Sequence, residues 1–348
     1  MSAELRHDVD LSRYTTLGCR SLARRYLAID RDEDLDAAAI WVQRERGPVS
    51  VLAGGSNVLP ATEIDGLTLH VRTRGVSVVE EGETVRITAA AGENWHGLVR
   101  RTLGLGLTGL ECLSLIPGSV GAAPIQNIGA YGAELGDTLA WVDVFDLHSG
   151  RSRRMLAAEC ELSYRDSVFR RQPSPGTLII SVTLRLTRCG ASLPEQPRYP
   201  DVTQELERLG VRHPSPIQMA EAVIRVRRRK LPDWRRIGNV GSVFKNPVVP
   251  RADAETLLRT WPALKSTSVQ AGVRLSAAQL IDLAGLKRLA IKGARPWPRQ
   301  PLVLTLARQQ PPAPITAFDE LIGAVQAAVA NHFGVALEIE PQRLPTGS

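Results

Sequence analysis

The sequence predicts an α+β protein of two or three domains. Its 348 residues exceed the length at which a single hydrophobic core usually stops growing. Short, locally connected strand patterns dominate the first part, and helical patterns become more frequent in the last part. The composition, 43% hydrophobic and 23% charged, is typical of a soluble globular protein.

The N-terminal region alternates strand and helix patterns. Its clearest helix has acidic residues in the first turn, which the helix dipole favours. We expect, in chain order, a strand at 25–29, a helix at 33–45, a buried strand at 49–53, a tight turn at 53–57, short strands between 67 and 89, and a helix at 94–104.

Residues 109–134 form a long segment that fits neither a helix nor a strand. The segment, GLECLSLIPGSVGAAPIQNIGAYGAE, is apolar and rich in glycine, and such long irregular segments are usually functional. Its glycines allow a flat ligand to approach the backbone closely, and Gln126, Asn127 and Tyr131 supply polar groups for it. An apolar loop that merely covers the surface is the alternative.

Regular patterns resume after this segment. A stretch rich in proline and polar residues, at 189–215, predicts a domain boundary. We expect strands at 139–146 and 177–187, a hairpin turn at 148–150, then a helix at 215–229, a turn at 238–247, helices near 252–260 and at 276–286, a strand at 301–307, a helix at 315–333 and a closing strand at 335–340.

The termini and the cysteines predict the compartment. The first residues are polar, and no apolar run reaches the length of a membrane span. The four cysteines are Cys19, Cys112, Cys160 and Cys189, and none forms a CxxC pair. We therefore expect a cytoplasmic protein with free thiols and no membrane insertion. Because the six histidines show no ligand spacing, we expect no metal site.

A net charge of +7 indicates an anionic partner, and much of the excess lies in RVRRRK at 225–230. This run has three interpretations: a solvated helix face, a nucleic-acid site, or a pair of cations that reach a diphosphate. No aromatic residues interleave with the run to stack on bases, which disfavours nucleic acid.

Two glycine motifs have the composition of phosphate-binding loops. Gly104, Gly106 and Gly109 spell GxGxxG, but they follow a predicted helix rather than a strand, so we interpret them as a helix end and turn. The sequence AGGSN at 53–57 is better placed, because it follows a buried strand and can form a nest of N–H groups for a pyrophosphate. An ordinary turn at the end of a strand explains it equally well.

Two polar motifs carry candidate catalytic groups. YRDSVF at 164–169 contains Arg165, and GNVGSVFKNP at 238–247 contains Ser242 within a glycine turn. A serine in such a turn is usually structural. It becomes a candidate proton donor only if the fold directs it at a substrate carbon.

The order of these motifs resembles that in the UDP-N-acetylenolpyruvoylglucosamine reductase (MurB) family, and the resemblance runs from about Thr15 to about Arg343. The motifs that carry it are, in order, AGGSNVL, AGENWHGLV, GLECLSLIPGSVGAAPIQNIGAYG, YRDSVF, RRRKLPD, GNVGSVFKNP, LSAAQLIDLAGLK and LEIEP. It implies the FAD-binding fold of the vanillyl-alcohol-oxidase type. We expect two FAD-binding subdomains, at 1–65 and 66–214, and a substrate-binding domain at 215–348.

The resemblance also implies a reaction. NADPH reduces FAD, and hydride then adds to UDP-N-acetylglucosamine enolpyruvate to give UDP-N-acetylmuramate for peptidoglycan. Arg165 matches the cation that stabilises the enolate, Ser242 the proton donor at C2, and Glu340 the acidic residue that assists. Glu338 competes with Glu340, because Ile339 replaces the proline that usually lies in this motif.

The resemblance further assigns ligand contacts. For FAD, the matching positions are Gly54, Gly55, Ser56, Asn57, Gly118, Ser119, Gly121, Gln126, Asn127 and Tyr131. For substrate they are Tyr199, in an insertion like the type I family loop, and Lys230, Asn246 and Gln300. We expect a monomer that binds the UDP-sugar and NADPH but no nucleic acid.

The substrate-domain sequence departs from the family pattern in several places. Gln279 replaces a common tryptophan, Gln342 stands where some members carry arginine or valine, and 286–301 lacks the expected glycine-rich run. A related flavin oxidoreductase with another substrate is therefore the alternative function.

Overall fold

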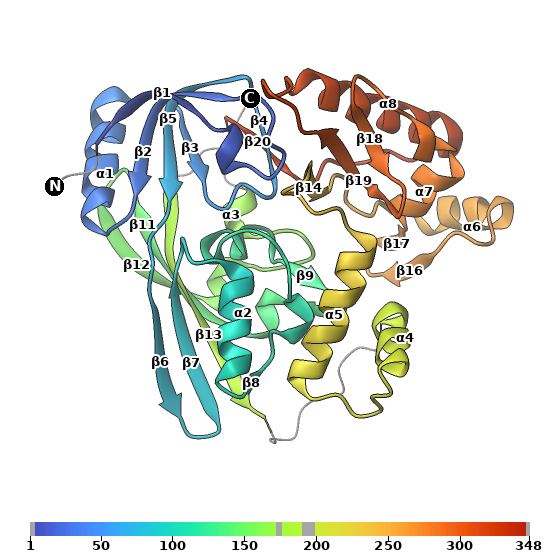
Figure 1. Cartoon of the computed structure of the whole chain (residues 1–348), viewed down its shortest axis with the longest axis horizontal. Coiled ribbons are helices and arrows are strands. Elements are labelled where there is room, and N and C mark those ends of the chain that lie inside the picture. The colour runs from blue at the N-terminus through green and yellow to red at the C-terminus, as the bar shows by residue number, and fades with distance from the viewer. Residues whose placement is uncertain (1–3, 172–175, 190–198, 346–348) are drawn as a thin grey trace.

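The computed structural model describes residues 4–171, 176–189 and 199–345, and it confirms the α+β class. In Figure 1 the first sheet lies at the upper left, a longer sheet extends below it, and the C-terminal helices and strands lie at the upper right. Helix α5 (Pro216–Lys230) lies between the lower sheet and the C-terminal elements. Among the described residues, no helix is long and apolar enough to cross a membrane.

The first sheet is mixed, with strand order β1-β2-β5-β3. Strands β2, β5 and β3 are parallel, and β1 pairs with β2 in the antiparallel direction. Helix α1 packs its Leu35 and Val42 into a core with Leu27 and Leu69 of the sheet. The bounds are β1 Arg6–Asp10, β2 Leu22–Ile29, α1 Glu33–Glu45, β3 Val49–Leu52 and β5 Glu63–Val71.

The second sheet is antiparallel, with strand order β12-β11-β13-β7-β6. Val182, Leu184 and Leu186 of β13 alternate into a core that also holds the buried Trp95 of α2, as the periodicity of two requires. The bounds are β6 Val76–Glu81, β7 Thr84–Ala90, α2 Trp95–Gly104, β8 Leu107–Thr108, β11 Leu139–Asp146, β12 Arg151–Leu156 and β13 Thr177–Arg188. Helix α2 ends at Gly104, and Gly106 has φ +70°, so the GxGxxG run is a helix end and turn as expected.

The predicted irregular segment consists of short pieces that cover this sheet. Three single 3₁₀ turns and two paired two-residue strands, β9 Gly129–Ala130 and β10 Ala133–Glu134, make up half of its length. Asn127 and Tyr131 adopt positive φ of 45° and 53°. Non-glycine residues rarely adopt that region, and such strain concentrates at functional sites.

Helices α4 (Pro200–Arg208) and α5 pack against each other, and only α5 was expected from the sequence. Helix α4 packs Val202 and Leu206 against Val223 and Val226 of α5. The sequence did not predict α4, because a proline-rich stretch flanks its short amphipathic pattern. Helix α5 begins with a capping box between Ser215 and Gln218, which satisfies its first N–H groups.

The C-terminal part builds its core around helix α8 and the strand β19. Phe318, Leu321 and Val325 of α8 pack with Leu304 and Leu306 of β19. The bounds are β14 Ile237–Ser242, β15 Val248–Val249, α6 Arg251–Thr260, β16 Ser266–Val269, β17 Gly272–Leu275, α7 Ala277–Leu283, β18 Ala294–Trp297, β19 Gln300–Ala307 and α8 Thr316–Phe333.

Two expectations in this part were wrong. The GNVGS sequence belongs to strand β14 rather than to a turn, and Gly241, at φ +75°, accommodates an irregularity in its pairing with β19. Residues 335–340 form no strand; only Ile339 bridges Phe244, because the alternate residues Val335 and Leu337 are buried in the α8 core instead of a sheet face. The closing strand is β20 (Gln342–Leu344).

Strand β20 pairs in parallel with β4 (Val58–Pro60), which directly follows the AGGSN turn. Figure 1 shows the C-terminal strand returning to the N-terminal part at this point. The pairing places Glu340 and Gln342 beside residues 53–57. The expected boundary at residue 65 falls inside β5, and the domain division stays a prediction.

Candidate functional site

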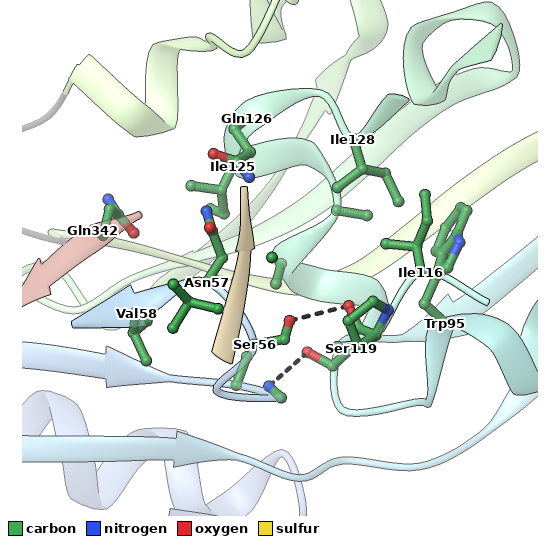
Figure 2. A pocket seen from close by; sticks show the side chains of 18 of the residues that line it. Ser56, Asn57, Val58, Trp95, Ile116, Ser119, Ile125, Gln126, Ile128 and Gln342 are labelled. Atoms are coloured by element: carbon green, nitrogen blue, oxygen red, sulfur yellow. Dashed lines mark hydrogen bonds between the residues drawn. The ribbon is translucent and has the colours of Figure 1, made fainter. Parts of the chain in front are cut away.

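A cavity of about 420 Å³ lies where the two N-terminal sheets, α5 and the C-terminal part meet. That volume is typical of a small-molecule or cofactor site. Figure 2 shows its mixed lining, in which Ile116, Ile125 and Ile128 supply apolar surface and Ser56, Asn57, Gln126 and Gln342 supply polar groups. The cavity therefore suits a flat, largely apolar ligand that carries a few hydrogen-bonding atoms.

Two glycine loops meet at the floor of this cavity. A Cβ added to Gly54 would lie 2.5 Å from Gly118 Cα, and one added to Gly118, at φ +117°, would lie 2.7 Å from Ser56 Oγ. A side chain at position 54 would displace backbone, and one at position 118 would displace the Ser56 hydroxyl and adopt an unfavourable φ. The two loops thus form a smooth backbone cradle of the kind that accepts a pyrophosphate.

Hydroxyl groups join the two loops. Ser56 Oγ donates to the carbonyl of Pro117 at 3.0 Å, and the N–H of Gly54 donates to Ser119 Oγ at 3.2 Å (Figure 2). Since the Ser119 oxygen accepts this bond, its own hydrogen stays available for a ligand in the cavity.

The buried side chain of His70 contacts the peptide between Ala53 and Gly54, whose N–H bonds Ser119. Tyr26 Oη lies 2.7 Å from His70 Nδ1, and the His70 ring also hydrogen-bonds the backbone of Ala53. The Ala53 carbonyl accepts from Nε2, so Nδ1 accepts from the tyrosine hydroxyl. Burial, followed by the nearby Arg72, lowers the pKa of His70 to about 4, and the ring is neutral at pH 7.

The three predicted catalytic residues line the same cavity. Arg165 Nε lies 3.1 Å from Glu340 Oε1, and Arg165 Nη2 donates to the carbonyl of Gly129 at 3.0 Å. Ser242, at the end of β14, is joined to this pair through the backbone, because the N–H of Glu340 donates to the carbonyl of the next residue, Val243, at 2.8 Å. A cation, a carboxylate and a hydroxyl therefore face one space.

The environment of Glu340 makes its ionisation costly. Its side chain is only 10% exposed, and burial raises the pKa of the carboxyl, while Arg165, then Arg170 and Lys245, oppose that rise. Glu338, the competing candidate, is largely exposed and pairs with Lys245 at 2.5 Å outside the cavity lining. The geometry therefore favours Glu340 for chemistry inside the cavity.

Arg227 is a cavity residue that the sequence analysis did not single out. Its side chain is half-buried, its Nε is buried without a hydrogen-bond partner among the described residues, and its guanidinium contacts the hydroxyl of Tyr131. Burial lowers the pKa of Arg227, but an arginine stays charged. Its helical spacing from the buried Val223 was the available signal for an inward cation within RVRRRK.

Lys230 lies at the cavity wall and pairs with Asp201 of α4, which lines the same space. The hairpin between β18 and β19 holds the end of α5, because Trp297 Nε1 donates to the carbonyl of Lys230 at 2.9 Å. Gln300, at the start of β19, reaches the cavity from that hairpin. These groups form the polar end of the site.

Most predicted ligand residues line the cavity. They are Gly54, Gly55, Ser56, Asn57, Gly118, Ser119, Gly121, Gln126, Tyr131, Lys230 and Gln300. Three lie outside the lining. Asn127 is buried and bonds Glu134 and Gly136, Asn246 Oδ1 accepts from the N–H of Ala277 at the start of α7, and Tyr199 is 49% exposed with its ring against Tyr131. Their ligand roles remain predictions.

The departures from the family pattern are spread unevenly around the cavity. Gln279 bonds the backbone of Lys265 and Ala263, and it does not line the cavity. Gln342 does line it, at the start of β20. The altered tryptophan position therefore supports the fold of the C-terminal part rather than ligand contact.

Two family models match the chain. The model described as "FAD binding domain" matches residues 23–155, and "UDP-N-acetylenolpyruvoylglucosamine reductase, C-terminal domain" matches residues 232–344. Among curated relatives, the UDP-N-acetylenolpyruvoylglucosamine reductase of Chromobacterium violaceum is 41% identical over 344 residues, covering 98% of this chain and 99% of the relative. That of Paraburkholderia phymatum is 42% identical over 341 residues, covering 96% of each chain.

One solved structure matches over the whole length. The crystal structure of the UDP-N-acetylenolpyruvylglucosamine reductase (MurB) from Thermus caldophilus is 26% identical, with a TM-score of 0.67. The match covers 99% of this chain and 100% of that one. The two chains therefore share their fold over nearly their whole length.

Proposed function

This chain belongs to the UDP-N-acetylenolpyruvoylglucosamine reductase family, and we propose on that premise that it reduces UDP-N-acetylglucosamine enolpyruvate to UDP-N-acetylmuramate in peptidoglycan synthesis. FAD is its resident cofactor and NADPH its reductant. The observation that carries the proposal is the meeting of Arg165, Glu340 and Ser242 in one cavity wall beside the two glycine loops.

The residues present fit FAD. The loops of Gly54 and Gly118, which pack too closely on each other to admit a Cβ, offer backbone to the pyrophosphate, and the hydrogen of the Ser119 hydroxyl fits the same role. The isoleucines of the 109–134 segment suit the faces of an isoalloxazine ring. The half-buried, incompletely bonded Arg227 fits an electronegative ligand edge. When bound, the flavin supplies the hydride that the enolpyruvyl group receives.

The protein residues then manage charge and proton. Addition at C3 of an enolpyruvyl ether places negative charge on the substrate carboxylate as an enolate. Arg165, held by Glu340 and by the Gly129 carbonyl, offers its cation to that charge in a space with little water. Ser242 donates the proton that C2 requires. Glu340 keeps Arg165 in place and assists the enolate step.

The polar end of the cavity takes the nucleotide-sugar. Lys230 contacts the diphosphate, and Gln300 contacts the uridine side. Asn246 and Tyr199 remain proposed contacts that require side-chain movement, since both lie outside the lining. We further propose that the protein acts as a monomer, because one chain supplies the whole cavity wall, and that it works in the cytosol, where nucleotide sugars are made.

Anaerobic half-reactions test the proposal. The purified protein should show a flavin spectrum, lose it on titration with NADPH, and regain it on addition of UDP-N-acetylglucosamine enolpyruvate. UDP-N-acetylglucosamine without the enolpyruvyl group is the control and should leave the flavin reduced. A protein that binds FAD yet ignores the enolpyruvyl substrate would support the related oxidoreductase with another substrate instead, and a colourless protein would refute both.

A further inference from the structure

Arg170 joins the two halves of the site although it belongs to neither set of expected residues. It lies on the single-turn helix α3 (Val168–Arg171), five positions after Arg165 in the YRDSVF region. Its Nη1 donates to Gln126 Oε1 at 3.0 Å, and its Nη2 donates to the backbone carbonyl of Glu340 at 2.9 Å. One guanidinium thus bonds both the proposed flavin loop and the backbone of the residue that carries the catalytic carboxylate.

Helix α3 is a rigid base for this contact. The buried Ser167 donates from Oγ to the carbonyl of Ile125 at 2.6 Å, and the N–H of Arg170 donates to the same Oγ at 3.2 Å. Ile125 and Gln126 are neighbours in the loop. The base of Arg170 and its tip therefore both attach to residues 125–126.

The far end of Arg170 completes the support of Glu340. The N–H of Glu340 donates to the Val243 carbonyl, next to Ser242, while its carbonyl accepts from Arg170. Both backbone polar groups of Glu340 are thereby bonded, the N–H to the residue that follows the proposed proton donor and the carbonyl to Arg170, which also bonds the flavin loop. A planar guanidinium can make both of its bonds at once, whereas an ammonium makes them only by rotation and with less reach.

Arg170 also acts on Glu340 through its charge. Arg165, Arg170 and Lys245 are the cations that face this carboxylate, and each lowers the pKa of Glu340 against the rise that burial causes. Without Arg170 the carboxyl would keep its proton to a higher pH.

We propose that Arg170 is a positioning residue that sets the distance between the flavin loop and the segments that carry Glu340 and Ser242. The inference rests on the proposed function, because it assigns a purpose to the geometry of that site. Arg170 reaches the reaction only through Gln126 and Glu340. Loss of Arg170 should slow reoxidation of the flavin by substrate more than it weakens the binding of FAD or of substrate.

Three variants test this inference: Arg170→Met, Arg170→Lys, and Arg171→Met as the matched control. Arg171 is next in the same helix, and its ion pairs among the described residues are with Glu161 and Asp166 at the surface. Asp166 is also held by backbone bonds to Ser163, which do not depend on Arg171. Each variant is measured for flavin reduction by NADPH, for reoxidation by substrate across pH, and for amide hydrogen exchange at Glu340 with and without FAD.

Arg170→Met should slow reoxidation about 10- to 100-fold, as expected for a small misplacement of reacting groups. It should shift the acidic limb of the pH profile upward and speed exchange at Glu340 even without FAD. Arg170→Lys should recover the pH profile, because it restores the charge, but only part of the rate. Arg171→Met should match the wild type in all three measurements.

The outcomes separate this inference from the proposed function. A wild type without reoxidation refutes the proposed function, whatever the variants do. A wild type that turns over while Arg170→Met matches Arg171→Met in rate, pH profile and exchange refutes the positioning role. Equal losses in both half-reactions, with unchanged exchange at Glu340, would also refute it, because the defect would then be general.

Discussion

Arg165 Nε lies 3.1 Å from Glu340 Oε1. This ion pair joins the YRDSVF region to the segment just before the C-terminal strand β20. Arg165 itself adopts φ +55°, a region that costs free energy for a residue with a side chain. The two side chains are 21% and 10% exposed, so water solvates the two charges only in part. Strain and a buried ion pair at one place indicate a geometry retained for chemistry rather than for stability.

Ser242→Ala should separate the two half-reactions. Flavin reduction by NADPH should stay within a factor of about two, whereas reoxidation by substrate should slow about 10²- to 10⁴-fold, the usual effect of removing a general acid. Stopped-flow absorbance under anaerobic conditions measures both rates. The exposed Ser268→Ala, in the same part of the chain, is the control. Equal slowing of both halves would show that Ser242 is not the proton donor.

Glu340→Gln should lower activity, and it should raise stability relative to the wild type as the pH rises. Because the pKa of Glu340 is raised in the folded state, the folded protein binds this proton more tightly than the unfolded chain does. The wild type therefore loses stability as pH rises through that pKa, and the glutamine variant lacks this loss. Melting temperatures should show the variant gaining on the wild type as the pH rises above 4.5, the ordinary pKa of the carboxyl. A constant difference would contradict the assigned shift.

His70→Gln should remove an acid-sensitive contribution to stability. The pKa of His70 falls from 6.5 to about 4 on folding, so the unfolded chain binds the proton first as pH drops. The wild type should lose up to about 3 kcal/mol of unfolding free energy between pH 6.5 and pH 4 from this group. Urea unfolding at several pH values measures it, with the exposed His7→Gln as control.

The same histidine should affect cofactor retention. Protonated Nδ1 would no longer accept from Tyr26, and the Ala53 peptide under the glycine loop would shift. FAD should therefore dissociate from the wild type near pH 4 to 5, as followed by the rise in free-flavin fluorescence. Retention of FAD at pH 4 by folded protein would show that the His70 contact does not support the loop.

Asp201→Asn should strengthen diphosphate binding. Asp201 pairs with Lys230 at the cavity wall, and Lys230 is the proposed contact for the diphosphate. An entering diphosphate must therefore displace the Asp201 carboxylate from Lys230. Both side chains are over a third exposed, which limits the effect to about two- to fivefold in the dissociation constant of UDP at low salt. Isothermal titration measures it, with the surface variant Asp282→Asn as control. Weaker binding would mean that Asp201 itself contacts the ligand.

The sequence by itself determined the elements that local periodicity controls and the loops that glycine requires. Helices 33–45 and 315–333, the strand at 177–187 and the AGGSN turn follow from nearest neighbours in the chain, and the structure has each of them nearly at the expected bounds. The order of motifs was enough to indicate the family, because each motif retains its local chemistry.

Only the tertiary structure decided which of several similar side chains faces the cavity. Within RVRRRK, Arg227 lines the cavity while its neighbour Arg228 faces water, and of the two C-terminal glutamates only Glu340 is in the cavity wall. The pairing of β20 with β4 and the bond from Arg170 to Glu340 hold Glu340 at the cavity. Both join residues far apart in the chain, and no local pattern encodes a contact whose free energy exists only once the chain has closed on itself.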